Sequence, residues 1–136
     1  MELPPVLLVH GFASSFERNW REPGWVDLLE EAGRRVIGVD LPGHGSAAKP
    51  HDPAAYANLE KAVKAVLPDE GIVDAVGFSL GAMLVLRVAA AAPEGFGRIV
   101  VGGVGANVFR QLDPEPAARA IESGDTRPGY PAVAQA

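Results

Sequence analysis

A serine set between two glycines, in Gly77-Phe78-Ser79-Leu80-Gly81, is the strongest chemical signal in the sequence. The motif lies between an apolar run at residues 72–76 and an almost wholly apolar stretch at residues 80–92, which predicts a sharp turn from a strand into a helix. Small residues two positions before and after the serine allow the chain to pack closely around this turn. The pattern favours Ser79 as a nucleophile for acyl groups over the alternative, a glycine-rich packing turn with an inert serine.

His10-Gly11-Phe12, which follows an apolar run at residues 6–9, predicts the second part of the same site. A serine that attacks an acyl carbon needs two N–H donors for the negative charge that develops on the carbonyl oxygen. We expect the backbone amides of Leu80 and Phe12 to be these donors, because Gly11 lets the backbone come close to a substrate. We expect His10 to hold this loop by a side-chain hydrogen bond rather than to transfer protons.

The segment from Asp40 to Ser46 follows another apolar run and begins with a turn pattern, Asp-Leu-Pro-Gly. We favour a structural role, in which Asp40 accepts hydrogen bonds from nearby backbone amides, over a catalytic role for Asp40 or His44. The sequence has no cysteine and three histidines, the third being His51, which excludes thiol catalysis and predicts no metal site. No phosphate-binding glycine loop is present, so we expect no cofactor.

Four apolar runs alternate with helical patterns along the chain. The predicted strands are residues 6–9, 35–39, 72–76 and 98–102, and the predicted helices are residues 25–32, 53–67 and 80–92. This alternation predicts an α/β fold with a mostly parallel sheet of about four strands and helices on both faces. We expect Trp20 and Trp25 to pack on the sheet or at a pocket rim, and Arg34 and Arg35 to be solvated or capping charges.

Composition limits the partners of this chain of 136 residues, whose length predicts a single domain. Twelve basic and 17 acidic side chains give a formal net charge of −5, which argues against a nucleic-acid or anionic membrane surface. The N-terminal segment has neither a basic region nor an apolar stretch of signal-peptide length. We therefore expect a cytoplasmic protein whose partner is a small molecule.

Together these motifs resemble those of the α/β-hydrolase superfamily, in order and in spacing. The resemblance implies an incomplete hydrolase core, the N-terminal part, at residues 1–110, and the start of a cap or linker at residues 111–136. It also implies a sheet in which the strands lie in the order second, first, third, fourth. Ser79 carries over as the nucleophile, and a serine there argues against the haloalkane dehalogenase and epoxide hydrolase branches, which attack with a carboxylate.

The superfamily uses a serine, an acid and a histidine in that chain order. No histidine follows His51, whereas Asp113 and Asp125 are candidates for the acid. We therefore predict a serine hydrolase acting on carboxylic esters or related acyl compounds, with a histidine and an acid that this chain does not contain. The alternative is an inactive fragment or interaction module whose apolar strand at residues 98–102 pairs with a missing C-terminal half or a second copy.

Overall fold

The computed structural model describes residues 2–106, 119 and 122–124. Contacts divide the chain into two units, Met1–Val104 and Gly105–Ala136, and the architecture given below is that of the first. The predicted cap or linker segment and both candidate acids, Asp113 and Asp125, lie in the second unit. Both aspartates, and nearly all of that segment, fall outside the described residues.

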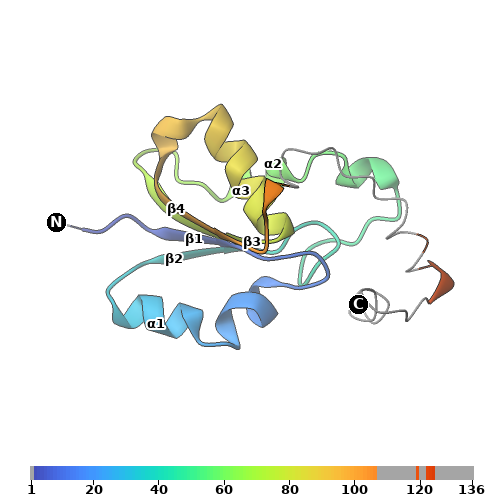
Figure 1. The fold of residues 1–136 in the computed structure, drawn as a ribbon, viewed down its shortest axis with the longest axis horizontal. Coiled ribbons are helices and arrows are strands. Elements are labelled where there is room, and N and C mark those ends of the chain that lie inside the picture. Colours follow the sequence, from blue (N-terminus) through green and yellow to red (C-terminus); the bar gives the residue numbers. More distant parts are fainter. Residues whose placement is uncertain (1, 107–118, 120–121, 125–136) are drawn as a thin grey trace. The chain divides into compact units, whose positions relative to one another are not determined.

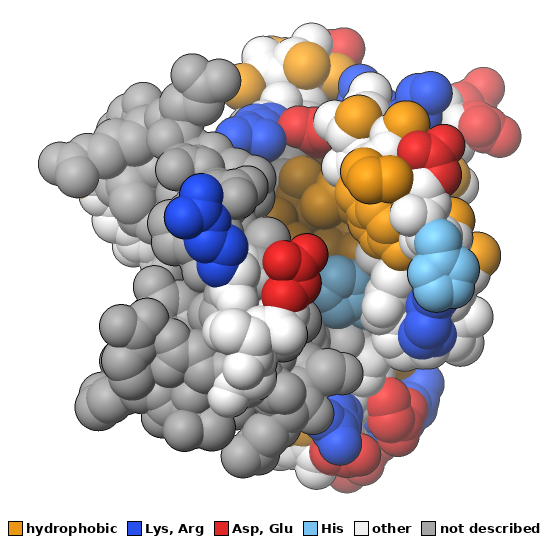
Figure 2. Space-filling model, turned by 90° about the vertical axis from the view of Figure 1, so that its right-hand side faces the viewer, with side chains coloured by type: hydrophobic (Ala, Val, Ile, Leu, Met, Phe, Trp, Pro, Cys, Tyr) orange, Lys and Arg blue, Asp and Glu red, His pale blue; other side chains and the backbone are white. Residues whose placement is uncertain are grey.

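The sheet of the first unit has the predicted strands in the predicted order. Its four strands, all parallel, are β1 (Val6–Val9), β2 (Val36–Val39), β3 (Val73–Phe78) and β4 (Phe96–Gly102), and their order is β2-β1-β3-β4 (Figure 1). β1 is buried along its whole length because it has a strand on either side and helices on both faces, which explains its unbroken apolar sequence. Since the strands are parallel, the loops that follow them gather at one end of the sheet, where hydrophobic and histidine side chains meet (Figure 2).

Two of the three predicted helices are present, and the third is divided. The helices α1 (Trp25–Glu31) and α3 (Leu80–Ala91) match the expected positions. The predicted helix at residues 53–67 is instead a 3₁₀ turn, η2 (Pro53–Tyr56), followed by α2 (Glu60–Ala65). Asp52 does cap the first piece, since its carboxylate accepts the amide of Ala54 at 3.0 Å. The interruption includes Asn58, whose side chain competes for backbone hydrogen bonds and disfavours a helix interior.

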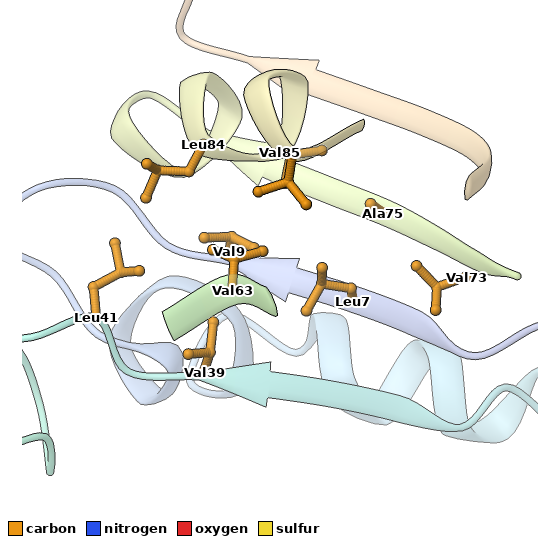
Figure 3. Packing of buried hydrophobic residues seen from close by; sticks show 10 residues of the cluster. Leu7, Val9, Val39, Leu41, Val63, Val73, Ala75, Leu84 and Val85 are labelled. Atoms are coloured by element: carbon orange, nitrogen blue, oxygen red, sulfur yellow. The ribbon is translucent and has the colours of Figure 1, made fainter. Parts of the chain in front are cut away.

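Alternate residues of β1 point into two separate hydrophobic clusters. Leu7 and Val9 pack with Val63 of α2 and with Leu84 and Val85 of α3 (Figure 3). On the opposite face, Val6 and Leu8 pack with Trp20 and with Val26 of α1. The predicted packing of Trp20 on the sheet is therefore confirmed, and half-exposed Trp25 meets it edge to face at 6.4 Å between ring centroids. Trp20 lies in a short π-helix that the sequence did not predict, η1 (Glu17–Arg21).

Arg34 is not the solvated charge that we expected. Its guanidinium donates to Asp74 at 2.7 Å and to the carbonyl oxygen of Pro4 at 2.6 Å, and the Arg34 and Asp74 side chains are 14% and 13% exposed. Asp74 also accepts the amide of Arg98 at 2.7 Å, at an irregularity in the pairing of β3 with β4. Partial burial would raise the pKa of Asp74, but the hydrogen bonds from Arg98 and Arg34 outweigh it and hold this pKa below its ordinary value.

β4 forms one edge of the sheet and presents apolar side chains to solvent. Ile99, Val100 and Val101 are 36%, 60% and 37% exposed, although they are consecutive and point to alternate faces. The centre of β4 is therefore little covered on either face by the described residues, whereas Phe96 at its start packs against the core. No helix in this described portion is both long enough and apolar enough to cross a bilayer.

Candidate functional site

Ser79 occupies a strained turn between β3 and α3. Its φ of 52° and ψ of −114° lie in a region that residues with a side chain rarely adopt. Its amide donates to the carbonyl oxygen of Gly102 at 2.9 Å, and its own carbonyl oxygen accepts the amide of Met83 at 3.1 Å. The first bond ties the turn to the end of β4 and the second starts α3, so the strained conformation is held from both sides.

The two glycines of the motif leave no room for a side chain. A Cβ atom on Gly77 would lie 2.6 Å from the Cα of Ala82 and 2.7 Å from the carbonyl oxygen of Gly81. One on Gly81 would overlap the carbonyl oxygen of Val9 and lie 2.5 Å from that of His10. The close packing expected around the turn is therefore present, and it presses the start of α3 against the end of β1.

The loop after β1 lies beside Ser79. A Cβ atom on Gly11 would lie 3.5 Å from the Cβ of Ser79 and 3.3 Å from the ring of Phe78. The amide of Gly11 donates to the side-chain oxygen of Asn19 at 3.0 Å, and the amide of Ala13 donates to Nε2 of His44 at 3.0 Å. Between them, the amide of Phe12 has no partner among the described residues.

His10 joins the loops that follow β1 and β2. Nε2 of this fully buried ring accepts the amide of Leu41 at 3.0 Å, so Nδ1 carries the proton and donates to the carbonyl oxygen of Gly11 at 2.7 Å. Burial lowers the pKa of His10 below its ordinary value, because the charged ring would be poorly solvated. The geometry agrees with the expected loop-holding role and leaves neither nitrogen free to transfer a proton.

Asp40 also links the two loops. Its carboxylate accepts the amide of Phe16 at 2.8 Å and both the amide and the hydroxyl of Ser46, at 2.9 and 2.8 Å. Partial burial would raise the pKa of Asp40, but these hydrogen bonds outweigh it and hold the pKa below its ordinary value. The expected structural role of Asp40 fits this geometry, although one of its amides comes from a loop 24 residues away in sequence.

His44 has both ring nitrogens occupied as well. Nε2 accepts the amide of Ala13, so Nδ1 carries the proton and donates to the carbonyl oxygen of Pro42 at 2.9 Å. The ring meets Phe12 edge to face, at 5.7 Å between centroids, and half of the Phe12 side chain remains exposed. This end of the sheet therefore combines a strained serine, a loop with an amide that has no partner among the described residues, and an aromatic side chain open to solvent.

Sequence reasoning missed Asn19. No spacing or motif predicts that an asparagine eight residues after Gly11 accepts the Gly11 amide. This hydrogen bond depends on the π-helix η1, which brings Asn19 close to the loop after β1. In the described part of the chain, no three histidine or acidic side chains are grouped to hold a metal ion.

Comparison with known proteins identifies a family over nearly the whole chain. Residues 4–127 match the family described as alpha/beta hydrolase fold. The chain is 38% identical over 94 residues to the dihydrolipoyllysine-residue acetyltransferase component of the acetoin cleaving system of Pseudomonas putida, covering 66% of this chain and 24% of that protein. It is 31% identical over 102 residues to an sn-1-specific diacylglycerol lipase of Mus musculus, covering 73% of this chain and 32% of the lipase.

A solved esterase from Exiguobacterium antarcticum shares the fold, with a TM-score of 0.70 and 26% sequence identity over 93% of this chain and 50% of the esterase. This chain thus spans half or less of the length of these three proteins. Their names describe different reactions, so the comparisons identify the family rather than the reaction. On the strength of the match over residues 4–127 and the shared fold, the chain belongs to the alpha/beta hydrolase family.

Proposed function

We propose that this chain carries the nucleophile and the oxyanion-binding amides of a serine hydrolase that acts on small carboxylic esters or related acyl compounds. Ser79 attacks the acyl carbon, and the amides of Leu80 and Phe12 stabilise the negative charge on the carbonyl oxygen. The observation that carries the proposal is the placement of the strained serine beside a loop whose Phe12 amide is unpartnered in the described residues. Leu80 begins α3, so its amide has no acceptor within the helix.

The base that activates Ser79 is not one of the histidines in this chain. His10 and His44 each donate from one ring nitrogen and accept at the other, so neither can take the proton of the serine. His51 is exposed in the segment before η2 and makes no hydrogen bond or ion pair with Ser79 within the described residues. We propose that a histidine and an acid from outside these 136 residues complete the site, in keeping with the partial coverage of the related proteins.

A fluorophosphonate probe tests the nucleophile directly, because the oxygen of an activated serine bonds to its phosphorus as the P–F bond breaks and fluoride leaves. Labelling is followed by intact mass, with free imidazole added to replace the absent histidine. We expect wild-type protein to be labelled at Ser79, at a rate that rises with imidazole concentration. Ser79→Ala should not be labelled at any concentration.

Ser14→Ala is the matched control, because Ser14 lies in the neighbouring loop and no hydrogen bond is recorded for its hydroxyl in the described residues. This variant should be labelled as fast as wild type. If the wild type stays unlabelled at high imidazole concentration, or if Ser79→Ala is labelled equally, the proposed mechanism is wrong. The hydrolase reaction itself is then tested with short-chain aryl esters under the same conditions.

The open edge of β4 favours a second candidate, a non-catalytic interaction module. Three consecutive apolar side chains, Ile99, Val100 and Val101, are exposed on this strand, and an open strand edge is a template for pairing with another strand. The occupant would be the C-terminal half of a hydrolase or a second copy of this chain. Sedimentation of the protein without probe distinguishes these two occupants. Pairing between copies depends on protein concentration, and Val100→Lys should abolish it.

A further inference from the structure

Two side chains hold the amides on either side of Phe12. Oδ1 of Asn19 accepts the amide of Gly11 at 3.0 Å, and Nε2 of His44 accepts the amide of Ala13 at 3.0 Å. These acceptors come from different parts of the chain, since Asn19 lies in η1 and His44 in the loop after β2. The amide of Phe12 is therefore bracketed by two satisfied amides, while it has no partner of its own among the described residues.

Each of the two acceptors is itself fixed. Asn19 is adjacent to Trp20, whose buried ring packs against β1 and α1. The backbone amide of Asn19 donates to the carbonyl oxygen of Ser15 at 2.9 Å. Nδ1 of His44 donates to Pro42, and this bond selects the tautomer whose Nε2 can accept. Both acceptors are thus held in place before any ligand arrives.

We propose that Asn19 and His44 are positioning residues for the oxyanion site. They hold the peptide groups around Phe12 so that its amide remains free and fixed beside Ser79, an inference that rests on the proposed function. The physical reason is that a free amide in a flexible loop can turn toward solvent or a neighbouring carbonyl group. An oxyanion donor is effective only if it is already oriented when charge develops.

Loss of either acceptor should act on the reaction rate more than on folding. Without Asn19, the amide of Gly11 loses its acceptor, and the peptide that leads into Phe12 can rotate. A displacement of about 1 Å at a reacting centre can lower the rate about 100-fold. We therefore expect Asn19→Ala and His44→Ala each to lower the rate constant of fluorophosphonate labelling by roughly 10- to 100-fold.

The chain offers a matched control for each variant. The hydroxyl of Ser15 accepts the amide of Arg18 at 3.1 Å at the start of η1, so Ser15→Ala removes the same kind of bond near Asn19. The ammonium group of Lys49 donates to the carbonyl oxygen of Gly45 at 2.6 Å, so Lys49→Ala removes a hydrogen bond from the loop that carries His44 and leaves both bonds of His44 in place. Both controls should be labelled within about twofold of the wild-type rate, because neither contacts the amides around Phe12.

The experiment measures the rate constant and the final labelled fraction separately for all five proteins, at one imidazole concentration. Partial unfolding lowers the labelled fraction, whereas loss of positioning lowers the rate constant of the folded molecules. Hydrogen exchange gives a second readout: the amide of Gly11 should exchange faster in Asn19→Ala and keep its protection in Ser15→Ala.

The outcomes separate this inference from the proposed function. If wild-type protein is labelled and Asn19→Ala or His44→Ala reacts as fast as its control, the positioning role of that residue is refuted while the nucleophile stands. If wild-type protein is not labelled at all, the proposed function fails and this inference fails with it. Slow labelling of Asn19→Ala and His44→Ala, with normal labelling of both controls, supports the inference.

Discussion

Replacing Gly81 by alanine should destabilise the fold, although alanine is the better helix former. The new Cβ atom would overlap the carbonyl oxygen of Val9 and lie 2.5 Å from that of His10. Ordinary contact between non-bonded heavy atoms begins at about 3.5 Å, so α3 and the end of β1 must separate by about 1 Å. Both obstacles are backbone atoms in the most buried strand, and no side chain can rotate away to make room.

The size of the effect follows from two opposing contributions. Overpacking a well-packed core costs about 1–3 kcal/mol, and overlap with two carbonyl groups puts Gly81→Ala at the upper end of that range. Replacing glycine by alanine in a helix stabilises the helix by at most about 1 kcal/mol. We therefore expect the free energy of unfolding to fall by about 2 kcal/mol.

Urea unfolding, followed by the fluorescence of buried Trp20 and half-exposed Trp25, measures this change. With a urea dependence of about 1–3 kcal/mol per molar, the midpoint should fall by about 1 M. Gly95→Ala is the control, because a Cβ atom on Gly95 meets nothing within 4 Å and should leave stability unchanged or raise it by about 0.5 kcal/mol. A Gly81→Ala protein as stable as wild type, or more stable, would refute the packing argument.

Three further predictions concern charges. Asp74→Ala should lower the free energy of unfolding by about 3 kcal/mol in urea titrations, because it leaves the largely buried guanidinium of Arg34 without its counter-charge; a loss below about 1 kcal/mol would contradict this. Arg87→Ala should change stability by less than about 0.5 kcal/mol by the same measurement, because its pair with Glu60 is exposed and 3.4 Å long. The pKa of His10 is lower in the folded chain, so below pH 6.5 the unfolded chain binds more protons than the folded chain. The free energy of unfolding should therefore be constant above the ordinary pKa of 6.5 and fall as the pH drops below it. The lowered pKa values of Asp40 and Asp74 should add a second loss of stability below pH 3.8, and thermal melts of wild type and His10→Gln across this range should differ in the first step alone.

The sequence predicted the elements whose burial leaves a local pattern. Val6–Val9 is apolar at every position because both faces of β1 are covered, and this run alone marks the strand. The glycines of the serine motif marked the tight turn for a similar reason, since a Cβ atom at either place has no room. Strand order followed from the resemblance to a known family and is confirmed.

Elements that depend on distant contacts could not be predicted in this way. Arg34 and Asp74 are 40 residues apart, so a pair of arginines in the sequence looked like solvated charge. Asn19 reaches Gly11 only because the π-helix η1 is anchored by Trp20, and a π-helix has no sequence period of its own. For the proposed oxyanion site, local motifs suggested the donor positions, whereas no local pattern indicated the hydrogen bond between Gly11 and Asn19.

The strained backbone of Ser79 costs stability at the residue that we propose as the nucleophile. Glycine adopts a φ of 52° without steric cost, so a scaffold chosen for stability alone would have glycine at this turn. Ser79→Ala removes the hydroxyl and keeps the strain, whereas Ser79→Gly removes both and should stabilise the fold by about 1 kcal/mol or more. A designer who wanted an inert version of this fold could therefore discard the serine and gain thermal tolerance in the same step.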